Sequence, residues 1–571
     1  MIRSLRAVLL CTGMAISVPF WSAPVAAQED AGAYLAGRSA SNANDFETAA
    51  GFFARSLMAD PTNPALLEGA LASYVGTGDM SRAAYIADNM IDLGLGSQLA
   101  YMASMSQQAK QGDWDALLNA QEAGQSIGPL VDGMARAWAH IGRGQMTAGI
   151  EAFDEMIEAE DGSRSFALYF KSLALASVGD YEGADAILGM SPMQGMQRTR
   201  RSTLAHAQVL SQLERNADAV ALIDAVFGER VDAKVADMRT RLSNGETVPF
   251  TYVNSPAEGF AETLYSVAQI LDGETDDFNT LIYARLAIDL DPTHTDATLL
   301  TARLLEQMGR FELADATYRQ IAPTDPAYSE AELGRAKALI HADRREAAVE
   351  VLQALIRRNP EQAMVHATLG DTLRQLDRMR DANDAYTQAL DLFPADSNVR
   401  WFVLYSRAIT HHDLDNWPAA EADFRASLAL NPDEARVLNY LGYSLVERQE
   451  KMDEALDMIE RAVASRPDSG AIVDSLGWVL YRMGRYDEAV GHMERAASLM
   501  PSDAVVNDHL GDTYWAVGRY TEAQFQWNRA LSFDPTEEDA ARIRRKIDVG
   551  LDVVLAEEGS DPLQVANGNG G

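Results

Sequence analysis

The sequence predicts an all-α protein, a superhelical solenoid of antiparallel helix hairpins. A proline recurs along the second half of the chain at intervals of 34, 34, 34, 38, 35, 34 and 34 residues, at Pro292, Pro326, Pro360, Pro394, Pro432, Pro467, Pro501 and Pro535. A ladder of alanines follows in phase, at Ala314, Ala348, Ala382, Ala420, Ala455, Ala489 and Ala523. A fixed period of this length indicates one helical hairpin per repeat, stacked so that neighbouring repeats bury a continuous core.

One repeat, residues 469–503, illustrates how the period produces a hairpin. Its apolar side chains keep helical spacing, and Gly477 lies where the two helices must approach closely. Gly484 ends the first helix, as glycine does in a left-handed cap, and Pro501 closes the hairpin because proline cannot continue a helix. This pattern resembles the tetratricopeptide repeat (TPR), and we expect about eight such repeats over residues 261–535.

Residues 28–227 predict a second, more divergent array of TPR-like hairpins. Alanines recur here at intervals of 34, 33, 32, 36 and 35 residues, at Ala49, Ala83, Ala116, Ala148, Ala184 and Ala219. Gly-Asp pairs, which are typical of the turn after a first helix, precede three of these alanines. We expect six hairpins in this array.

An irregular segment, residues 228–260, separates the two predicted arrays. It contains two prolines and a run of β-forming residues, neither of which continues a helical hairpin. We interpret it as an ordered loop packed on the solenoid or as an interdomain hinge; a loop that occupies the groove as an internal peptide mimic is the alternative. After the last repeat, residues 536–558 predict one amphipathic capping helix, and residues 559–571 predict a disordered tail.

Residues 1–27 have the features of a cleavable secretory signal. Two arginines precede a short apolar stretch, and small residues precede Gln28. The apolar stretch is shorter than the roughly 20 residues that span a bilayer, and no later segment qualifies as transmembrane. The single cysteine, Cys11, follows Leu10 and not the small residue of a lipoprotein signal, which disfavours outer-membrane anchoring. We therefore expect a periplasmic protein without disulfides.

The formal charge of −36 restricts the class of partner. Such a field repels nucleic acid and anionic membrane surfaces. The acidity either keeps a long solenoid soluble or attracts basic proteins.

No catalytic, cofactor-binding or metal-binding motif with convincing spacing occurs in the sequence. Phosphate-binding glycine loops, paired Cys-x-x-Cys and His-Glu-x-x-His motifs and nucleophile elbows are all missing. His411 and His412 are adjacent, and adjacent residues on a helix point in different directions, so they would not share a metal. We expect neither an enzyme nor a cofactor.

The predicted partner-binding residues lie on the first helices of the last three repeats. In a TPR, these helices line the concave face, and five positions of each point into it. Aromatic rings beside carboxylates would suit a peptide with apolar anchors and a Lys or Arg. Packing of Trp478 and Trp515 between hairpins is the alternative. The predicted groove residues are Asn439, Tyr443, Asp474, Trp478, Tyr481, Asp508, Asp512 and Trp515.

Three stretches are more particular than a general TPR: residues 438–444, 472–478 and 507–512. They resemble a family of exported TPR proteins of Gram-negative proteobacteria, over about residues 261–550. One branch of that family is an outer-membrane lipoprotein that brings cell-wall hydrolases to a periplasmic carboxyl-terminal processing protease. The resemblance implies an adaptor whose partners are that class of protease and those hydrolases. The missing lipoprotein signal departs from that branch.

Two other functions remain open at this point. The chain could be a scaffold for envelope or cell-wall assembly enzymes, with no proteolysis involved. An enzyme whose site is assembled from several distant repeats is the remote alternative.

Overall fold

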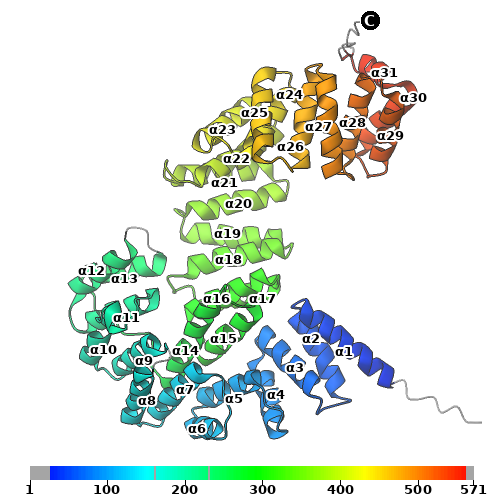
Figure 1. The fold of residues 1–571 in the computed structure, drawn as a ribbon. Helices are drawn as coiled ribbons and strands as arrows, with labels where there is room; N and C mark the ends of the chain where they lie inside the picture. The colour runs from blue at the N-terminus through cyan, green and yellow to red at the C-terminus, as the bar shows by residue number, and fades with distance from the viewer. Residues whose placement is uncertain (1–25, 160–161, 229–231, 561–562, 564–571) are drawn as a thin grey trace, which may run out of the picture. The chain divides into compact units, whose positions relative to one another are not determined.

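Antiparallel helical hairpins follow one another through the computed structural model, which describes residues 26–159, 162–228, 232–560 and 563 (Figure 1). The described residues contain helices and no strand, which confirms the predicted all-α solenoid of hairpins. Predictions for the signal peptide (1–27) and the tail (559–571) fall almost wholly outside the described residues.

Six hairpins form the N-terminal array, each pairing an odd-numbered first helix with the next even-numbered one. Their helices are α1 (Ala26–Asn42), α2 (Phe46–Leu57), α3 (Pro64–Thr77), α4 (Met80–Asp92), α5 (Gln98–Gln111), α6 (Trp114–Glu122), α7 (Pro129–Gly142), α8 (Met146–Glu158), α9 (Arg164–Ser177), α10 (Tyr181–Leu188), α11 (Arg200–Gln212) and α12 (Asn216–Phe227).

Eight further hairpins begin at α14, and here the even-numbered helix comes first. Their helices are α14 (Pro256–Leu271), α15 (Asp277–Leu290), α16 (Thr295–Gln307), α17 (Phe311–Tyr318), α18 (Tyr328–His341), α19 (Arg345–Arg358), α20 (Ala363–Gln375), α21 (Met379–Leu392), α22 (Arg400–Asp413), α23 (Trp417–Leu430), α24 (Ala435–Glu447), α25 (Met452–Ser465), α26 (Gly470–Arg482), α27 (Tyr486–Leu499), α28 (Ala504–Ala516) and α29 (Tyr520–Leu531).

Each alanine of the ladder lies on the second helix of a hairpin. All seven of its C-terminal members, from Ala314 to Ala523, are fully buried. Small side chains are therefore buried at the same place in successive hairpins, so the period of the sequence is the period of the packing.

The helix after the last hairpin differs from the single capping helix predicted for residues 536–558. Two helices form there, α30 (Glu537–Val549) and α31 (Leu551–Glu557). Gly550 between them has φ of 87°, a left-handed conformation that glycine adopts at no steric cost. The chain therefore turns at Gly550, and two short helices cover the last hairpin where one long helix was expected.

The irregular segment is shorter than the predicted 228–260. Helix α13 (Ala233–Ser243) lies within it, and α14 already begins at Pro256. The remaining residues, 244–255, pack against α11, where the side-chain amide of Gln212 donates to the Val248 carbonyl at 2.7 Å. Val248 and Val253 are buried, so the segment is an ordered loop on the solenoid, as one of the predicted readings had it.

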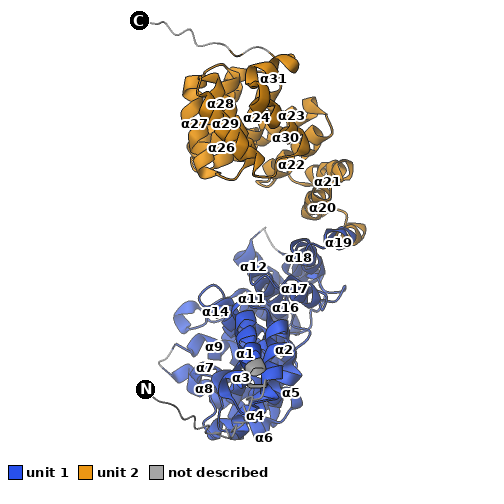
Figure 2. Ribbon diagram, turned by 90° about the vertical axis from the view of Figure 1, so that its right-hand side faces the viewer, with its two compact units in different colours: residues 1–351 blue, residues 352–571 orange. Residues whose placement is uncertain are grey.

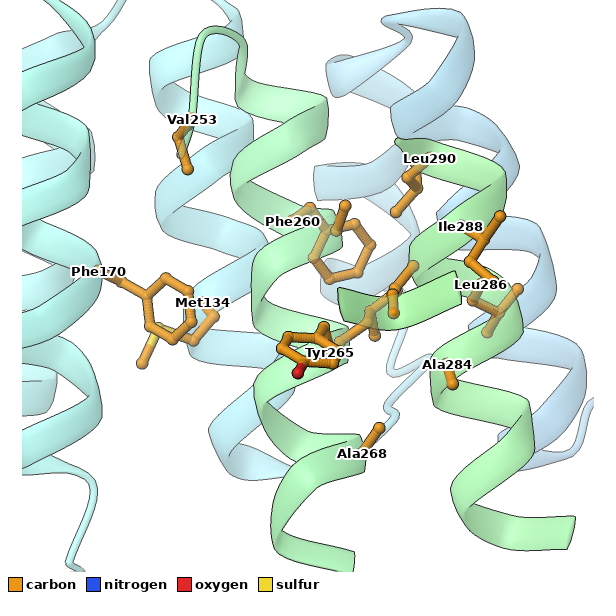
Figure 3. Close-up of a cluster of buried hydrophobic side chains, with 14 of the residues drawn as sticks. Met134, Phe170, Val253, Phe260, Tyr265, Ala268, Ala284, Leu286, Ile288 and Leu290 are labelled. Atoms are coloured by element: carbon orange, nitrogen blue, oxygen red, sulfur yellow. The ribbon is translucent and has the colours of Figure 1, made fainter. Parts of the chain in front are cut away.

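Helix α14 also packs on the N-terminal array, on α5, α7 and α9 (Figure 3). Phe260 of α14 and Met134 of α7 are both fully buried. A Cβ at Gly259 would lie 2.5 Å from the Trp138 ring, so only glycine allows this approach of α14 to α7. The hinge reading of the segment therefore does not hold, because its two sides share one core.

The chain divides into two compact units between Val351 and Leu352 (Figure 2). Unit 1 contains a large hydrophobic core, from Phe46 to Ala338, and a small cluster of Ala49, Phe53, Leu66 and Ala70, and unit 2 contains a core from Ala408 to Leu551. Each core runs through successive hairpins, as expected for a stack in which each repeat packs on its neighbours.

Candidate protein-binding groove

First helices of four consecutive hairpins, α22, α24, α26 and α28, line a pocket of about 390 Å³ in unit 2. We call this pocket the unit 2 groove. Its apolar wall includes the rings of Tyr440 and Tyr443 and the side chain of Val505, which is 51% exposed. Its polar lining includes Asn439, Asp474 and His509.

Asn439 lines this groove and has hydrogen-bonding capacity that the described residues do not use. Its side-chain carbonyl oxygen is buried and accepts no hydrogen bond from the described residues. A buried amide oxygen without a donor is costly, so a ligand that donates to Asn439 recovers that cost. A side-chain amide both donates and accepts, which matches the main chain of an extended peptide.

Asp474 and His509 form a buried ion pair in the wall of the groove. The distance from Asp474 Oδ2 to His509 Nδ1 is 3.0 Å, and the His509 ring stacks on Trp478 with centroids 3.9 Å apart. Burial lowers the pKa of His509, but the charges of Asp474, Asp508 and Asp512 outweigh it and raise the pKa above its usual value. The pair presents a charge-neutralised surface, and Asp474 is not an open carboxylate.

Three of the eight predicted residues, Asn439, Tyr443 and Asp474, line the unit 2 groove. Trp478 and Tyr481 are buried to 8% and 7% exposure, and their rings stack with centroids 4.8 Å apart. The Trp478 indole donates to Glu447 at 2.7 Å. Trp478 therefore packs between hairpins, as the alternative interpretation proposed. It contacts the groove through the ring of His509, which lines it.

Asp508 and Asp512 do not face an open groove, which corrects their predicted role. Lys546 of α30 is fully buried, and its Nζ lies 2.8 Å from Asp508 Oδ2 and 2.7 Å from Asp512 Oδ1. Arg542 adds a second cation within 3.9 Å of both carboxylates. The capping helix thus supplies the basic group that was expected from a partner.

Trp515 is also engaged by the capping helices. Its indole donates to Asp552 of α31 at 2.9 Å, and its ring lies 5.3 Å from that of Trp527. Trp515 lines a separate pocket of about 490 Å³ at the hairpin ends, together with Tyr520. It is not brought together with Asn439 and Tyr443.

Sequence reasoning missed His509, Val505 and Lys546. Lys546 follows Asp512 by 34 residues, so extending the repeat register by one further unit would have placed it on the same surface. His509 and Val505 lie beside predicted positions, and no signal in the sequence separates them from core residues.

The adjacent histidines His411 and His412 contact different groups. His411 contacts Asp423 at 3.9 Å, whereas His412 Nδ1 lies 3.1 Å from the Tyr440 hydroxyl. Within residues 26–159, 162–228, 232–560 and 563, no group of three or more His, Cys, Asp or Glu side chains is placed to hold a metal. Across the same residues, none of the helices has the length and apolar character needed to cross a bilayer.

Comparison with known proteins identifies the repeats. One tetratricopeptide-repeat model matches residues 299–363, 333–397 and 405–472, and a second matches residues 474–503. The chain within these ranges is therefore built from tetratricopeptide repeats, which are modules that bind proteins or peptides. This confirms the repeat type predicted for the C-terminal array.

A TPR repeat-containing protein of Pseudomonas aeruginosa is 30% identical over 184 residues, which cover 32% of this chain and 30% of the relative. Among solved structures, a chain of the APC/C hetero-tetramer Cut9–Hcn1 aligns over 91% of this chain and 96% of its own, at 16% identity and a TM-score of 0.38. A tetratricopeptide repeat protein of Parabacteroides merdae aligns over 45% of this chain and 98% of its own, at 14% identity and a TM-score of 0.36. The fold assignment rests on the hairpins themselves and not on these scores.

Proposed function

We propose that this chain is a non-catalytic periplasmic adaptor, and that the unit 2 groove docks a protein partner. In this proposal the adaptor presents cell-envelope substrates, such as cell-wall hydrolases, to a processing protease. The observation that carries the docking role is the groove itself, in which an apolar wall lies beside Asn439, whose side-chain carbonyl oxygen accepts no hydrogen bond from the described residues. The resemblance of residues 261–550 to exported TPR adaptors supports the choice of partners.

The groove favours an apolar side chain with a hydrogen-bonding main chain next to it. Tyr443 and Tyr440 provide large, rigid contact surfaces that lose little conformational entropy on binding. The carboxylates once expected to attract a Lys or Arg are neutralised by His509 and Lys546. Recognition at this groove therefore depends on shape and hydrogen bonding more than on charge.

The test is affinity capture with residues 28–571 from a periplasmic extract, with the captured proteins identified and quantified by mass spectrometry. Val505→Glu places a charge on the apolar wall, at the second residue of α28, where a carboxylate suits the helix terminus. We expect it to lower recovery of a processing protease or of cell-wall hydrolases by about tenfold, which corresponds to about 1.4 kcal/mol.

The matched control is Phe525→Glu, which changes an apolar residue of α29 that is 69% exposed and does not line the groove. Equal losses in the two variants would contradict docking at the groove. Capture of envelope assembly enzymes with no protease would overturn the adaptor role and favour the scaffold. Deletion of the gene separates the same two functions, because loss of an adaptor makes hydrolases accumulate, whereas loss of a scaffold misplaces enzymes at unchanged levels.

A further inference from the structure

A second groove lies in unit 1, on the first helices α14, α16 and α18. Its volume is about 520 Å³, and we call it the unit 1 groove. Leu299, Leu300 and Leu333 give it an apolar floor, and Tyr265 and Tyr318 contribute buried rings. A Cβ at Gly334 would lie 2.5 Å from the Tyr318 ring, so the bare glycine backbone lets that ring close one end of the floor.

Four carboxylates line this groove, and two of them are neutralised within the protein. Asp272 pairs with Arg303, and Asp296 pairs with Arg201 and Lys234. Because their charges are compensated within the protein, we do not expect these two carboxylates to bind a cation of a partner.

The other two carboxylates, Glu306 and Glu330, make no ion pair with the residues that the structure describes. Tyr318 donates to the Glu306 carboxylate, but Glu306 Oε1 is buried and accepts no hydrogen bond from the described residues. Burial raises the pKa of Glu306, and burial together with the charges of Asp232 and Asp296 raises the pKa of Glu330. Lys337 and His341 lower the pKa of Glu306, and Arg200 lowers that of Glu330, but burial outweighs these charges and both pKa values stay raised. Both carboxylates would therefore gain from a cation in direct contact.

Two cations line this groove, Arg303 and Lys337, and among the described residues Lys337 makes no ion pair. Lys337 is exposed. Its charge lowers the pKa of Glu306, but the effect of burial is larger, so the pKa remains above its usual value. The balance of one lysine against two glutamates leaves the groove negative. The net charge of −36 for the whole chain also attracts positively charged partners at longer range.

We propose that the unit 1 groove binds an extended segment of a second protein in which a Lys or Arg side chain lies next to an apolar side chain. The cation pairs with Glu306 and Glu330, and the apolar side chain packs on the leucine floor. In the unit 2 groove the lining carboxylate outside an ion pair, among the described residues, is Asp503, and it accepts a hydrogen bond from the Val506 amide at the start of α28. The two grooves therefore differ in their open charge and select different segments. The adaptor thereby has two docking sites of different chemistry, an inference that goes beyond the proposed function and does not depend on the identity of either partner.

The experiment uses a phage-displayed random heptapeptide library as the probe and the chain 28–571 as the target. The library is counter-selected on the double variant Glu306→Gln, Glu330→Gln, so that only peptides that need these carboxylates remain. We expect the remaining peptides to be enriched in Lys or Arg beside an apolar residue. The synthetic form of one such peptide should bind the double variant about tenfold more weakly than the unaltered chain in fluorescence anisotropy.

Two further variants make the outcome decisive. Glu346→Gln with Glu350→Gln removes the same charge from exposed positions of α19 and should leave binding unchanged, which excludes a general charge effect. Lys337→Glu removes the competing cation and should tighten binding several-fold, a gain that misfolding cannot produce. Val505→Glu should leave this peptide bound, so failure at the unit 2 groove is distinguishable from failure here.

Three outcomes would overturn the inference. The first is that the counter-selected peptides lack basic residues. Enrichment of acidic residues in their place would mean that Lys337 and Arg303, not the glutamates, bind the peptide. The second is an equal loss of peptide affinity in the α19 control and in the Glu306, Glu330 double variant, which would show that only the net charge of the chain matters. Loss of binding in EDTA would show that a divalent cation occupies the carboxylates.

Discussion

At the scale of single residues, the wall of the unit 2 groove contains a buried ion pair between Asp474 and His509. His509 is 8% exposed and contacts the Asp474 carboxylate, while Asp508 and Asp512 surround it with further negative charge. Burial alone would favour the neutral imidazole, but three carboxylates favour the imidazolium. The stacked Trp478 ring covers one face of that cation and limits its contact with water.

This arrangement predicts how the stability of unit 2 depends on pH. The pKa of His509 is higher in the folded than in the unfolded state, so its protonation stabilises the fold fully below pH about 6.5. The contribution is lost as the pH rises through the folded-state pKa. We expect His509→Gln to lower the urea midpoint most below pH 6.5 or so and progressively less above it.

The measurement is urea denaturation followed by tryptophan fluorescence at a series of pH values, for the unaltered chain and for His509→Gln. The pKa of Asp508 is raised by burial and by Asp512 but lowered by His509, so the same comparison is repeated in an Asp508→Asn background. A difference that grows as the pH rises would mean that His509 is neutral in the folded protein.

Counting positions along the helices predicted Asn439, Tyr443 and Asp474 as groove residues because the repeat register fixes which face each side chain occupies. The same counting could not foresee that Lys546 would neutralise Asp508 and Asp512. That contact depends on where the chain turns after the last marker proline, and tertiary packing decides it. Burial of Trp478 likewise depends on His509 and Glu447, which come from neighbouring hairpins.

At the scale of helices, close contact between paired helices depends on the absence of a side chain at one position. A Cβ at Gly511 of α28 would lie 2.4 Å from the Trp527 ring of α29, which is fully buried and donates to Asp512 at 2.9 Å. We expect Gly511→Ala to cost about 1–3 kcal/mol in strain, offset by about 1 kcal/mol of helix propensity. The net result is a lower melting temperature, measured by circular dichroism.

Gly491 of α27 is the matched control because it is exposed, and a Cβ there would have no neighbour within 4 Å. Gly491→Ala should raise the melting temperature, since alanine is favoured over glycine in a helix by about 0.5–1 kcal/mol. An equal rise in melting temperature for the two substitutions would show that α28 and α29 can move apart without a loss of stability.

The period of the sequence predicted the number and order of the hairpins, because each repeat carries its own turn and its own small residues. Helix α13 was missed because it stands alone between two hairpins and repeats nothing. The turn at Gly550 was missed because glycine is tolerated in an amphipathic helix pattern, and its left-handed conformation is visible only in the structure.

At the scale of the whole molecule, the two compact units each have their own hydrophobic core. In a repeat stack, stability is the sum of the repeats and of the contacts between neighbours, so a local defect weakens nearby repeats first. The division at residues 351 and 352 does not coincide with the irregular segment, because Gly259, Phe260 and Met134 join that segment's two sides in unit 1.

Lys546→Met tests this organisation, because it leaves Asp508 and Asp512 without their buried counter-charge. Removing one partner of a buried ion pair costs about 3–5 kcal/mol, and Arg542 within 3.9 Å should reduce that loss. In hydrogen-exchange mass spectrometry of the full chain, we expect faster exchange in α28 to α31, a smaller change toward α22, and unchanged protection in unit 1. The variant Lys546→Met with Asp508→Asn and Asp512→Asn should restore much of the protection. A uniform rise in exchange across residues 26–560 would instead show that the chain unfolds as one cooperative body, since the loss of a single contact would then be shared by every hairpin.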